Sequence, residues 1–530
     1  AFYGVFILTK ITFPEELEKI YGYAFSNADI TSKIEITKNV DTIQGYAFDN
    51  CQIHGQLDFT QSTKLEEIVS NAFSEAQIES IIFPPNIQFI KPRAFKDATI
   101  SSTLTFPAKL EKIESSAFEG GKGFTTLDFS KATALKEIGT SAFKGTEVSS
   151  PVNFPAKLEK IGETAFSGDN KDEITPLSTI TFNSDLKEIG SKAFVNIITL
   201  TQMNNLKVKD LSSSAFSGCR NMVASTIIIL PSGKIDKKAF FDCYNLASDV
   251  TIQAATELNS DKELIYSNVL ANAFQNSGIK TISFPPYLEK IDTSAFENCT
   301  SLTGSGSISC QTIAKNAFYD DNQVVFSTIN ATSILASAFE NCHKLNAAIT
   351  IYYYGSIAQK AFKNCYSLKG LEFLFDEEDG IATKDKQEIE GKKNTIGTEA
   401  FYRSGLTGSL TIPITIYEIG KEAFAHCSKL TSLTIDECDD KDFLLTINEK
   451  AFYRSNLGGK LVLPYNTKIV DEYAFAYCPL TALEVRGTGL IEDGTTELKD
   501  FAFYACKISA LTFLNEDVSF TTKTFRGCPL

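Results

Sequence analysis

The sequence lacks tryptophan and has only three histidines and two methionines among its 530 residues. So few histidines leave little general-base chemistry to assign, because histidine is the side chain most often used for that role. Fifty basic residues stand against 65 acidic ones, which gives a net charge of −15. Because such a field repels phosphate backbones, the sequence predicts no nucleic-acid partner.

Long apolar segments are also missing. The run TIIIL at 226–230 is typical of the longest, whereas a membrane helix needs about 20 apolar residues. The first residues show no basic segment followed by an apolar one, so no signal peptide is visible. The glycine-rich phosphate loop, HExxH and GxSxG motifs are absent as well. We therefore expect no membrane span in this chain, no cofactor, no metal site and no catalytic residue.

A single repeated phrase occupies the chain instead. Its most constant element is Ala-Phe, and the recurring phenylalanine uses 22 of the 41 phenylalanines at intervals that are mostly 21 to 25 residues. The positions are Phe2, Phe25, Phe48, Phe73, Phe95, Phe118, Phe143, Phe166, Phe194, Phe216, Phe240, Phe274, Phe296, Phe318, Phe339, Phe362, Phe401, Phe424, Phe452, Phe475, Phe503 and Phe525. Two intervals are much longer, 34 residues from Phe240 to Phe274 and 39 residues from Phe362 to Phe401.

A second position confirms the register of the repeat. Five residues before each phenylalanine from Phe25 onward stands an apolar residue, in all 21 cases, and 16 of these are isoleucine. The apolar residue, such as Ile291, precedes the alanine by four positions. That is the spacing of one helical turn, so we expect both side chains on the inward side.

The segments between the Ala-Phe turns alternate apolar and polar residues, as in IKTISFPP at 279–286 and SLTIP at 409–413. Such alternation predicts strands, and the proline that follows ends each strand because it cannot donate a ladder hydrogen bond. One unit of about 23 residues cannot bury its apolar side alone, but stacked units can. The sequence therefore predicts one repeat solenoid of about 22 coils over residues 1–530, with a parallel sheet of short strands joined by turns.

The phrases LEKIDTSAFENCTSL and YEIGKEAFAHCSKLTSLTI make the repeat specific. They resemble the BspA-like, or treponemal-type, leucine-rich repeat family, and the resemblance covers nearly the whole chain. It implies a right-handed, curved solenoid. It also implies a surface or secreted protein associated with adhesion to host or neighbouring cells.

Ten of the 12 cysteines stand three residues after the repeat phenylalanine, and Cys310 and Cys438 are the exceptions. Other repeats carry mostly small residues there, which predicts a buried corner of the coil rather than a reactive thiol. Cysteines of adjacent coils, such as Cys342 and Cys365, would lie within bridging distance, so disulfides remain an alternative. Zinc is not favoured, because no CxxC pair exists.

The central residue of each strand triplet should face solvent and form a row along the solenoid. This strand row is our candidate interaction face, and its alternative explanation is the preference of threonine for exposed strands. The row comprises Thr12, Glu35, Asp58, Thr105, Asp128, Asn153, Thr181, Ser283, Thr411, Thr434, Glu484 and Thr512. We expect an acidic, hydroxyl-bearing face.

The two long intervals contain additions to the coil. A charged insertion at about 376–393 is interpreted as a solvated loop, with partner contact as the alternative. Residues 241–273 form a long repeat. Neither DEEDG at 376–380 nor DECDDKD at 436–442 has the alternating spacing of a dedicated calcium loop.

Two functions follow from these observations. The first is a non-enzymatic protein, on the cell surface or secreted, that binds a protein or glycan partner of a host or neighbouring cell along the solenoid face. The alternative is an intracellular scaffold or spacer in a larger assembly, which would be cytoplasmic. Many thiol-like cysteines fit a reducing compartment and favour this alternative.

Overall fold

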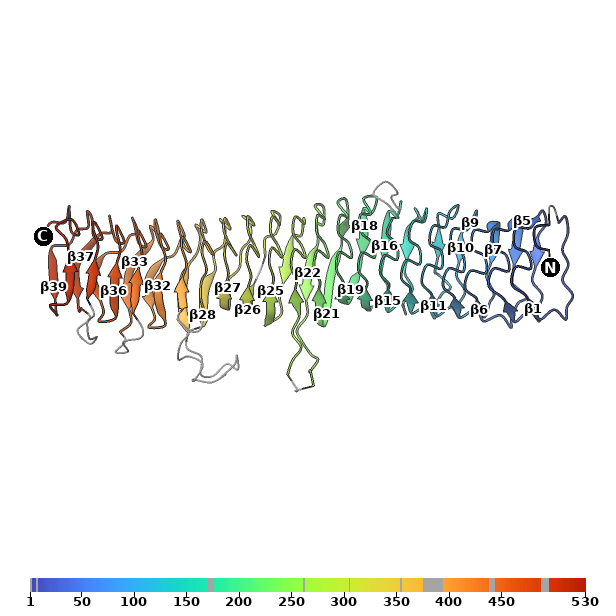
Figure 1. Ribbon diagram of the computed structural model, residues 1–530, viewed down its shortest axis with the longest axis horizontal. Helices are drawn as coiled ribbons and strands as arrows, with labels where there is room; N and C mark the ends of the chain where they lie inside the picture. The colour runs from blue at the N-terminus through green and yellow to red at the C-terminus, as the bar shows by residue number, and fades with distance from the viewer. Residues whose placement is uncertain are drawn as a thin grey trace. The chain divides into compact units, whose positions relative to one another are not determined.

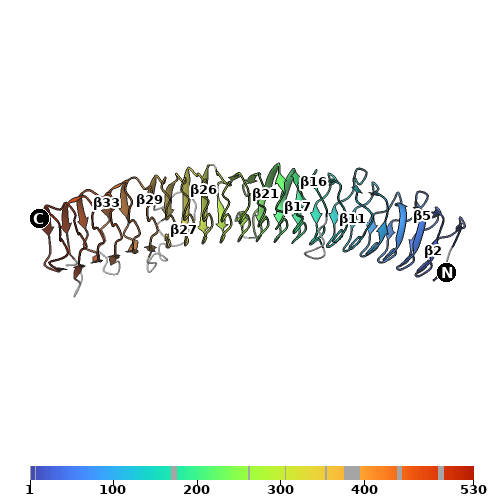
Figure 2. The same cartoon turned by 90° about the horizontal axis from the view of Figure 1, so that it is seen from above.

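The computed structural model describes residues 2–5, 8–168, 176–260, 263–304, 306–352, 355–374, 394–437, 444–487 and 495–530. Throughout these ranges the chain forms short strands and turns, and no described residue lies in a helix. The chain divides into two compact units, residues 1–265 with 273–279 and residues 266–272 with 280–530. Within each unit, successive coils lie side by side (Figures 1 and 2). The organisation of residues 1–530 as one domain stays a prediction.

One set of strands in each unit carries the apolar residue that precedes the Ala-Phe turn, and we call these the isoleucine strands. In the first unit they are β1 (Lys19–Ile20), β4 (Thr42–Ile43), β6 (Glu67–Ile68), β8 (Phe89–Ile90), β11 (Lys112–Ile113), β13 (Glu137–Ile138), β15 (Lys160–Ile161), β17 (Leu186–Ile189), β19 (Leu206–Leu211) and β21 (Thr226–Ile235). In the second unit they are β23 (Asn268–Val269), β25 (Leu288–Ile291), β26 (Ser307–Ile313), β27 (Thr328–Ile334), β30 (Asn394–Ile396), β32 (Ile416–Ile419), β34 (Leu445–Ile447), β36 (Thr467–Val470), β38 (Thr496–Leu498) and β40 (Val518–Phe520).

A second set of strands follows the Ala-Phe turn and contains the predicted triplets. In the first unit these are β2 (Asp29–Ile30), β3 (Ile34–Glu35), β5 (Gln52–Asp58), β7 (Gln77–Ile82), β9 (Thr99–Ile100), β10 (Leu104–Thr105), β12 (Leu127–Asp128), β14 (Val152–Asn153), β16 (Thr179–Thr181), β18 (Gln202–Asn204), β20 (Val223–Ala224) and β22 (Asp249–Ile252). In the second unit they are β24 (Thr281–Ser283), β28 (Ala348–Tyr352), β29 (Gly370–Leu374), β31 (Gly408–Ile412), β33 (Leu430–Ile435), β35 (Gly459–Leu463), β37 (Leu480–Val485) and β39 (Ala510–Phe513).

Strands of successive coils pair in parallel and put equivalent residues side by side. Ile113 of β11, for example, pairs with Ile90 of β8 on one side and with Ile138 of β13 on the other. In the second unit Ile447 of β34 pairs with Ile419 and Val470 in the same way. The repeat solenoid with parallel sheets that the sequence predicts is therefore confirmed.

The repeat phenylalanines form the centre of each unit's core. Their rings stack face to face from coil to coil, with centroids 4.9 Å apart for Phe25 and Phe48 and 5.0 Å apart for Phe318 and Phe339. Most of these side chains have no exposed surface. A spacing of about 5 Å matches the distance between hydrogen-bonded strands, so the sheet itself holds the rings in contact.

In most repeats the isoleucine and the alanine are buried, as expected; Ile113 and Ala117 have no exposed surface. Their four-residue spacing does not reflect a helical turn, however, and that part of the prediction is wrong. The isoleucine lies in a strand and the alanine in a turn, because a residue in the left-handed region reverses the chain between them. In this repeat that residue is Ser116, with φ 56°.

The long intervals leave the stacking unchanged. Phe240 and Phe274 are 5.2 Å apart, and so are Phe362 and Phe401. In the long repeat 241–273 the chain leaves the coil after β22, and Leu258 and Leu264 pair in an antiparallel bridge. The charged insertion at 376–393 lies outside the described residues.

Candidate interaction surfaces

The structure places most of the strand row in the second set of strands. Glu35, Asn153, Thr411, Thr434 and Thr512 are exposed at the centres of their triplets, as predicted. Ser283 of β24 and Thr12, which lies in no named strand, are also exposed. Thr105, Asp128, Thr181 and Glu484 are partly covered. Asp58 is the exception, since it is only 9% exposed.

The parallel register brings neighbouring members of the row together. Thr105 pairs with Asp128, and Asn153 pairs with Thr181. In the second unit Thr411 pairs with Thr434, and Glu484 pairs with Thr512. Side chains at paired positions of parallel strands point to the same face of the sheet. The row is therefore a physical surface within each unit.

The carboxylates of the row are already engaged by other groups. Lys33 Nζ lies 2.8 Å from Glu35 Oε1 and 2.9 Å from Asp58 Oδ2. Glu484 contacts Lys460 Nζ at 2.6 Å and Arg486 Nε at 2.9 Å. The row therefore does not present the unpaired acidic face that the sequence suggested. Its free functional groups are chiefly hydroxyls and amides.

Two aspartates of the row hold the turn that follows their strand. Asp58 Oδ1 accepts a hydrogen bond of 2.9 Å from the Thr60 backbone, and Asp128 Oδ1 accepts one of 2.9 Å from the Ser130 backbone. Burial favours a higher pKa at Asp58, but hydrogen bonds from Lys33 and Thr60 outweigh it and lower the pKa. Hydrogen bonds from Ser130 lower the pKa of Asp128. Both residues thus have a structural role.

The cysteines are core residues, as predicted. The 11 described cysteines are free thiols, and all are buried except Cys528, which is partly exposed. Each of several thiols donates a hydrogen bond to the repeat phenylalanine of the preceding coil; Cys219 Sγ, for example, lies 3.0 Å from Phe194 O. Burial raises the pKa of Cys219 to about 12. The thiols therefore stay protonated and act as donors. Cys438 lies outside the described residues.

Asp321 occupies the cysteine position of its coil and is fully buried. Burial, reinforced by Asp320 and Glu297 and opposed by the backbone of Cys299, raises the pKa of Asp321 well above its usual value. Burial therefore favours the neutral, protonated form of this carboxyl over the carboxylate. A neutral carboxyl is a small polar group with one donor, so it can replace a thiol at this position.

A second surface runs along the Ala-Phe turns of the second unit and was missed by the sequence analysis. We call it the aromatic ladder and define it as Tyr402, His426, Tyr453, Tyr477 and Tyr504. Successive ring centroids are 5.5, 5.6, 5.6 and 5.4 Å apart, and each pair meets edge to face. Tyr477 is 43% exposed, and the other four rings are partly exposed.

Two arginines lie on the rings of this ladder. The Arg403 guanidinium is 5.3 Å from the Tyr402 centroid. The Arg454 guanidinium lies 5.3 Å from the Tyr453 centroid and 5.0 Å from that of Tyr477. Burial, with Arg403 and Arg454 nearby, lowers the pKa of His426. His426 is therefore a neutral ring within the ladder.

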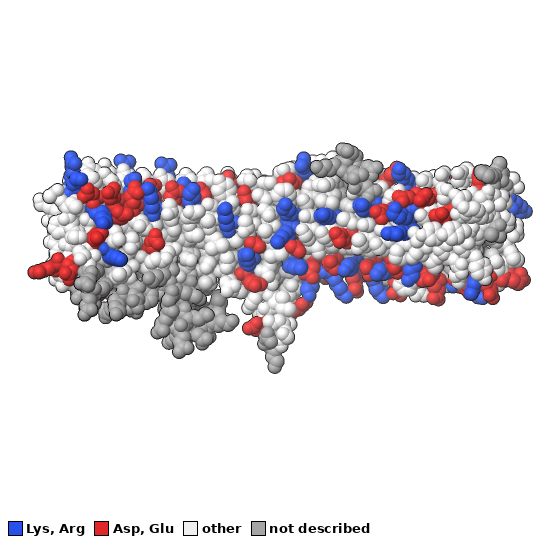
Figure 3. Space-filling view, viewed as in Figure 1, with Lys and Arg blue, Asp and Glu red and all other residues white. Residues whose placement is uncertain are grey.

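The isoleucine strands carry a third kind of surface, made of ion pairs between coils. Lys112 Nζ lies 3.0 Å from Glu137 Oε2, and Lys160 Nζ lies 2.7 Å from Glu188 Oε2. In Figure 3, positive and negative side chains alternate along the lower right edge, where Figure 1 places these strands of the first unit. Exposed pairs of this kind contribute little stability each, and their charges largely cancel. This surface therefore offers no strong field to a charged partner.

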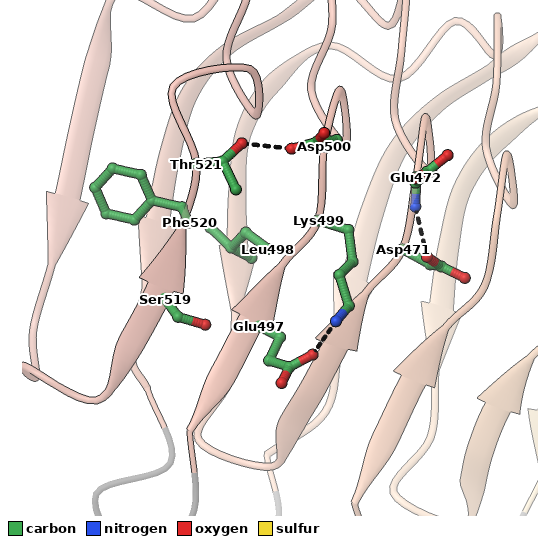
Figure 4. Close-up of a pocket in the computed structure, with 9 residues that line it drawn as sticks. All are labelled: Asp471, Glu472, Glu497, Leu498, Lys499, Asp500, Ser519, Phe520 and Thr521. Carbon is green, nitrogen blue, oxygen red and sulfur yellow. Dashed lines mark hydrogen bonds and ion pairs between the residues drawn. The ribbon is translucent and has the colours of Figure 1, made fainter.

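A hollow of about 490 Å³ in the second unit lies beside β38 and β40. Figure 4 shows its polar groups bonded to one another: Lys499 to Glu497, and Thr521 to Asp500 at 2.5 Å. Across the described residues, no group of three or more histidine, cysteine, aspartate or glutamate side chains could hold a metal ion. The acidic segment at 436–442 lies mostly outside them.

No helix in the described part of the chain is long and apolar enough to cross a membrane. Among curated proteins, none matches the chain. Solved structures similar to it include a leucine-rich repeat protein from Bacteroides ovatus, which is 17% identical with a TM-score of 0.41 over 82% of this chain and 93% of that one. A leucine-rich cell surface protein from Faecalibacterium prausnitzii is 16% identical with a TM-score of 0.24 over 80% and 89%. The pneumococcal vaccine antigen PcpA is 16% identical with a TM-score of 0.19 over 98% and 84%.

The decisive comparison is with a family model. The model of the BspA type leucine-rich repeat region, which spans six copies of the repeat, matches overlapping stretches that together cover residues 1–369 and 394–530. Those stretches include both compact units and all 22 repeat phenylalanines. The chain therefore belongs to the BspA-type leucine-rich repeat family.

Proposed function

We propose that this protein is a non-enzymatic adhesion or interaction protein, on the cell surface or secreted, that binds a protein or glycan partner through the strand row. The partner belongs to a host or neighbouring cell. The observation that carries the proposal is the register of the second set of strands, which places Thr411 beside Thr434 and Asn153 beside Thr181. A repeated surface of this kind binds through many weak contacts that add up.

The most informative site for a test is the pair Thr411 and Thr434. Both side chains are exposed and lie in adjacent strands, so Thr411→Lys with Thr434→Lys changes the surface without altering the core. Asp58 is unsuitable because its carboxylate holds Lys33 and Thr60. We expect the double variant to bind cells or matrix protein at least several-fold more weakly, since two long cations now interrupt the row.

The matched control is Lys136→Thr with Lys187→Thr, which changes two exposed lysines outside the row. This variant should bind as the wild type does. Equal binding by the row variant and the wild type, with both folded by circular dichroism, would remove this part of the row from the site.

One observation favours the intracellular scaffold as a second candidate function. The 11 described cysteines are free, which suits a reducing compartment. Treating intact cells with an impermeant biotinylation reagent separates the two candidates. Labelling of the protein on intact cells, or its recovery from the medium, supports the adhesion function. Labelling that requires permeabilised cells, together with co-purification of an intracellular assembly, supports the scaffold.

A further inference from the structure

The aromatic ladder departs from the rule that the rest of the solenoid follows. The residue two places after the repeat phenylalanine adopts positive φ in nearly every coil, as at Asn27 (58°), Asn298 (61°) and Asn341 (67°). From Phe25 to Phe362 this position is almost always asparagine, aspartate or glycine, the residues that adopt this conformation at least cost. Function often explains positions at which a sequence breaks such a local rule.

In the following coils the same position becomes arginine, histidine, arginine and tyrosine. Arg403, His426, Arg454 and Tyr477 keep positive φ, at 54°, 63°, 53° and 65°. Each such residue costs about 1–2 kcal/mol relative to an unstrained one. Bulky residues also adopt positive φ two places before the repeat phenylalanine, as at Arg93 and Lys192, so strain by itself assigns no role. What distinguishes these four adjacent coils is the loss of asparagine, aspartate and glycine at this one position, which makes the side chains there candidates for a binding role.

The ladder also has a repeat of two coils. Tyr402, Tyr453 and Tyr504 directly follow the repeat phenylalanine in alternate coils, whereas the coils between them carry buried Ala425 or Ala476 at that position and a ring one residue later. At about 4.8 Å per coil, equivalent rings recur about every 10 Å. Such a surface fits a linear polymer that presents the same groups at regular intervals.

The charges of the ladder are positive and available. Among the residues that the structure describes, no carboxylate lies within ion-pairing distance of the Arg403 or Arg454 guanidinium. The nearby Glu399 and Glu449 are engaged by lysines, through contacts of 2.5 Å to Lys363 and 2.6 Å to Lys421. Two unpaired guanidiniums in a chain of net charge −15 favour a ligand that carries its own anionic groups.

The backbone amides along the ladder are already bonded within the protein and do not offer donors to an extended peptide. The Arg403 amide donates to Ala425 O, the His426 amide to Tyr453 O and the Arg454 amide to Ala476 O, at 2.9, 2.8 and 3.0 Å. A peptide that adds to a sheet edge gains its affinity from main-chain hydrogen bonds. Here recognition depends on ring faces, hydroxyls and guanidiniums alone, which are the groups that bind the C–H faces and carboxylates of sugars.

We propose that the aromatic ladder, with Arg403 and Arg454, binds an acidic polysaccharide whose sugars carry carboxylate groups. The rings stack on sugar faces, and each guanidinium takes one carboxylate as a two-point ion pair. The inference deepens the proposed function, because it names a partner class and a surface separate from the strand row.

The test measures binding of the whole chain to immobilised hyaluronan by biolayer interferometry. Arg403→Gln with Arg454→Gln should weaken binding about tenfold or more, because two charge-assisted contacts are lost. Tyr453→Leu with Tyr477→Leu should weaken binding on the order of tenfold as well, because the leucines keep apolar bulk but remove the ring faces. Neutral dextran should not bind.

The charge-matched control is Arg93→Gln with Arg220→Gln, which removes two arginines of the first unit and should leave affinity unchanged. Binding of poly-L-glutamate that equals hyaluronan binding and survives the tyrosine changes would overturn the proposal in favour of an acidic peptide. Absence of hyaluronan binding by folded wild type would overturn it too.

Thr411→Lys with Thr434→Lys distinguishes this inference from the proposed function. If that variant loses cell binding but keeps hyaluronan binding, the two surfaces act separately and both proposals stand. If the ladder variants bind hyaluronan as the wild type does while the strand-row variant loses cell binding, only the ladder proposal fails.

Discussion

The same position of the coil serves two purposes in two regions of the molecule. At Asp320, Asn341 and Asn364 short polar side chains bond to one another, with Asn341 Nδ2 donating to Asp320 Oδ1 at 2.6 Å and Asn364 Nδ2 donating to Asn341 Oδ1 at 2.9 Å. From Arg403 to Tyr477 the position carries cations and rings instead. The core beneath is unchanged, since Phe339 and Phe362 stack at 5.2 Å and Phe424 and Phe452 at 5.1 Å.

The difference shows that the turn surface changes from coil to coil while the core stays the same. Stacked phenylalanines and paired isoleucine strands hold every coil, so the turn surface is free to vary. We call the surface formed by Asp320, Asn341 and Asn364 the amide ladder. There the residues are ones that adopt positive φ at little cost, and each side chain bonds to that of the next coil. Where the surface is an aromatic ladder, backbone preference is sacrificed. The following changes test that contrast, from the largest expected effect to the smallest.

Removing a core ring should cost the same in both regions. Phe339→Ala and Phe452→Ala should each lower the free energy of unfolding by about 3–5 kcal/mol, because a buried ring is lost and a cavity remains. In a stacked solenoid the damage should stay among neighbouring coils. Hydrogen exchange with peptide resolution measures this. Loosening spread evenly over both units would contradict a stability held coil by coil.

Breaking the amide ladder should cost less. Asn341→Ala removes the hydrogen bonds to Asp320 and Asn364 and places alanine at φ 67°. We expect a loss of about 1–3 kcal/mol in the free energy of unfolding, measured by urea denaturation. The control Asn341→Gly, which also loses the bonds but accepts positive φ, should cost less than alanine. Equal costs would show that the conformation does not matter.

Asp321, which directly follows Asp320 of the amide ladder, should give a pH dependence of stability. Asp321 has a raised pKa in the folded state, so its contribution is full below its unfolded pKa and is lost as pH rises through the folded pKa. From about pH 5 to about pH 8 the melting temperature of the wild type should fall more than that of Asp321→Asn. Parallel curves for the two proteins in calorimetry would show that Asp321 does not titrate abnormally.

The smallest change should be a gain. Arg454→Asn puts a residue suited to positive φ at 53°, so stability should rise by about 1 kcal/mol or less. Chemical denaturation measures the difference, and Lys91→Asn, at a coil position without positive φ, serves as the control that should not gain. The same Arg454→Asn variant should bind hyaluronan more weakly. A gain in stability with unchanged binding would show that Arg454 does not contribute to hyaluronan binding.

The core could be predicted from the sequence because buried residues recur at a regular spacing along the chain. That spacing can be recognised without knowing which coils pack against one another. The repeat phenylalanine, the isoleucine five residues earlier and the small residue three residues later all lie where the pattern placed them. The isoleucine strands were missed, however, because a four-residue spacing between Ile113 and Ala117 suits one helical turn as well as a strand followed by a turn. The β-branched preference of that position was the available indication.

The candidate surfaces were less predictable. Alternation fixed which residues of a triplet face outward, and Thr411 and Thr434 obey it, but Asp58 is covered because Lys33 and Thr60 close over its carboxylate. The aromatic ladder left only a faint sequence trace, the change from asparagine to arginine, histidine and tyrosine after the repeat phenylalanine. That change gains meaning once positive φ at every one of these positions is known.

By itself the sequence determined that the chain coils, how often, and which residues fill the coil, because a repeat of about 23 residues can bury its apolar side only by stacking. The tertiary structure decided what the surface offers. Contacts between residues of neighbouring coils, 21 to 39 positions apart in the sequence, determine how each charged group is used. Glu484 forms an ion pair with Lys460, whereas the Arg454 guanidinium lies over the Tyr477 ring. Those contacts depend on register and side-chain reach across coils, which one strand's own pattern does not encode.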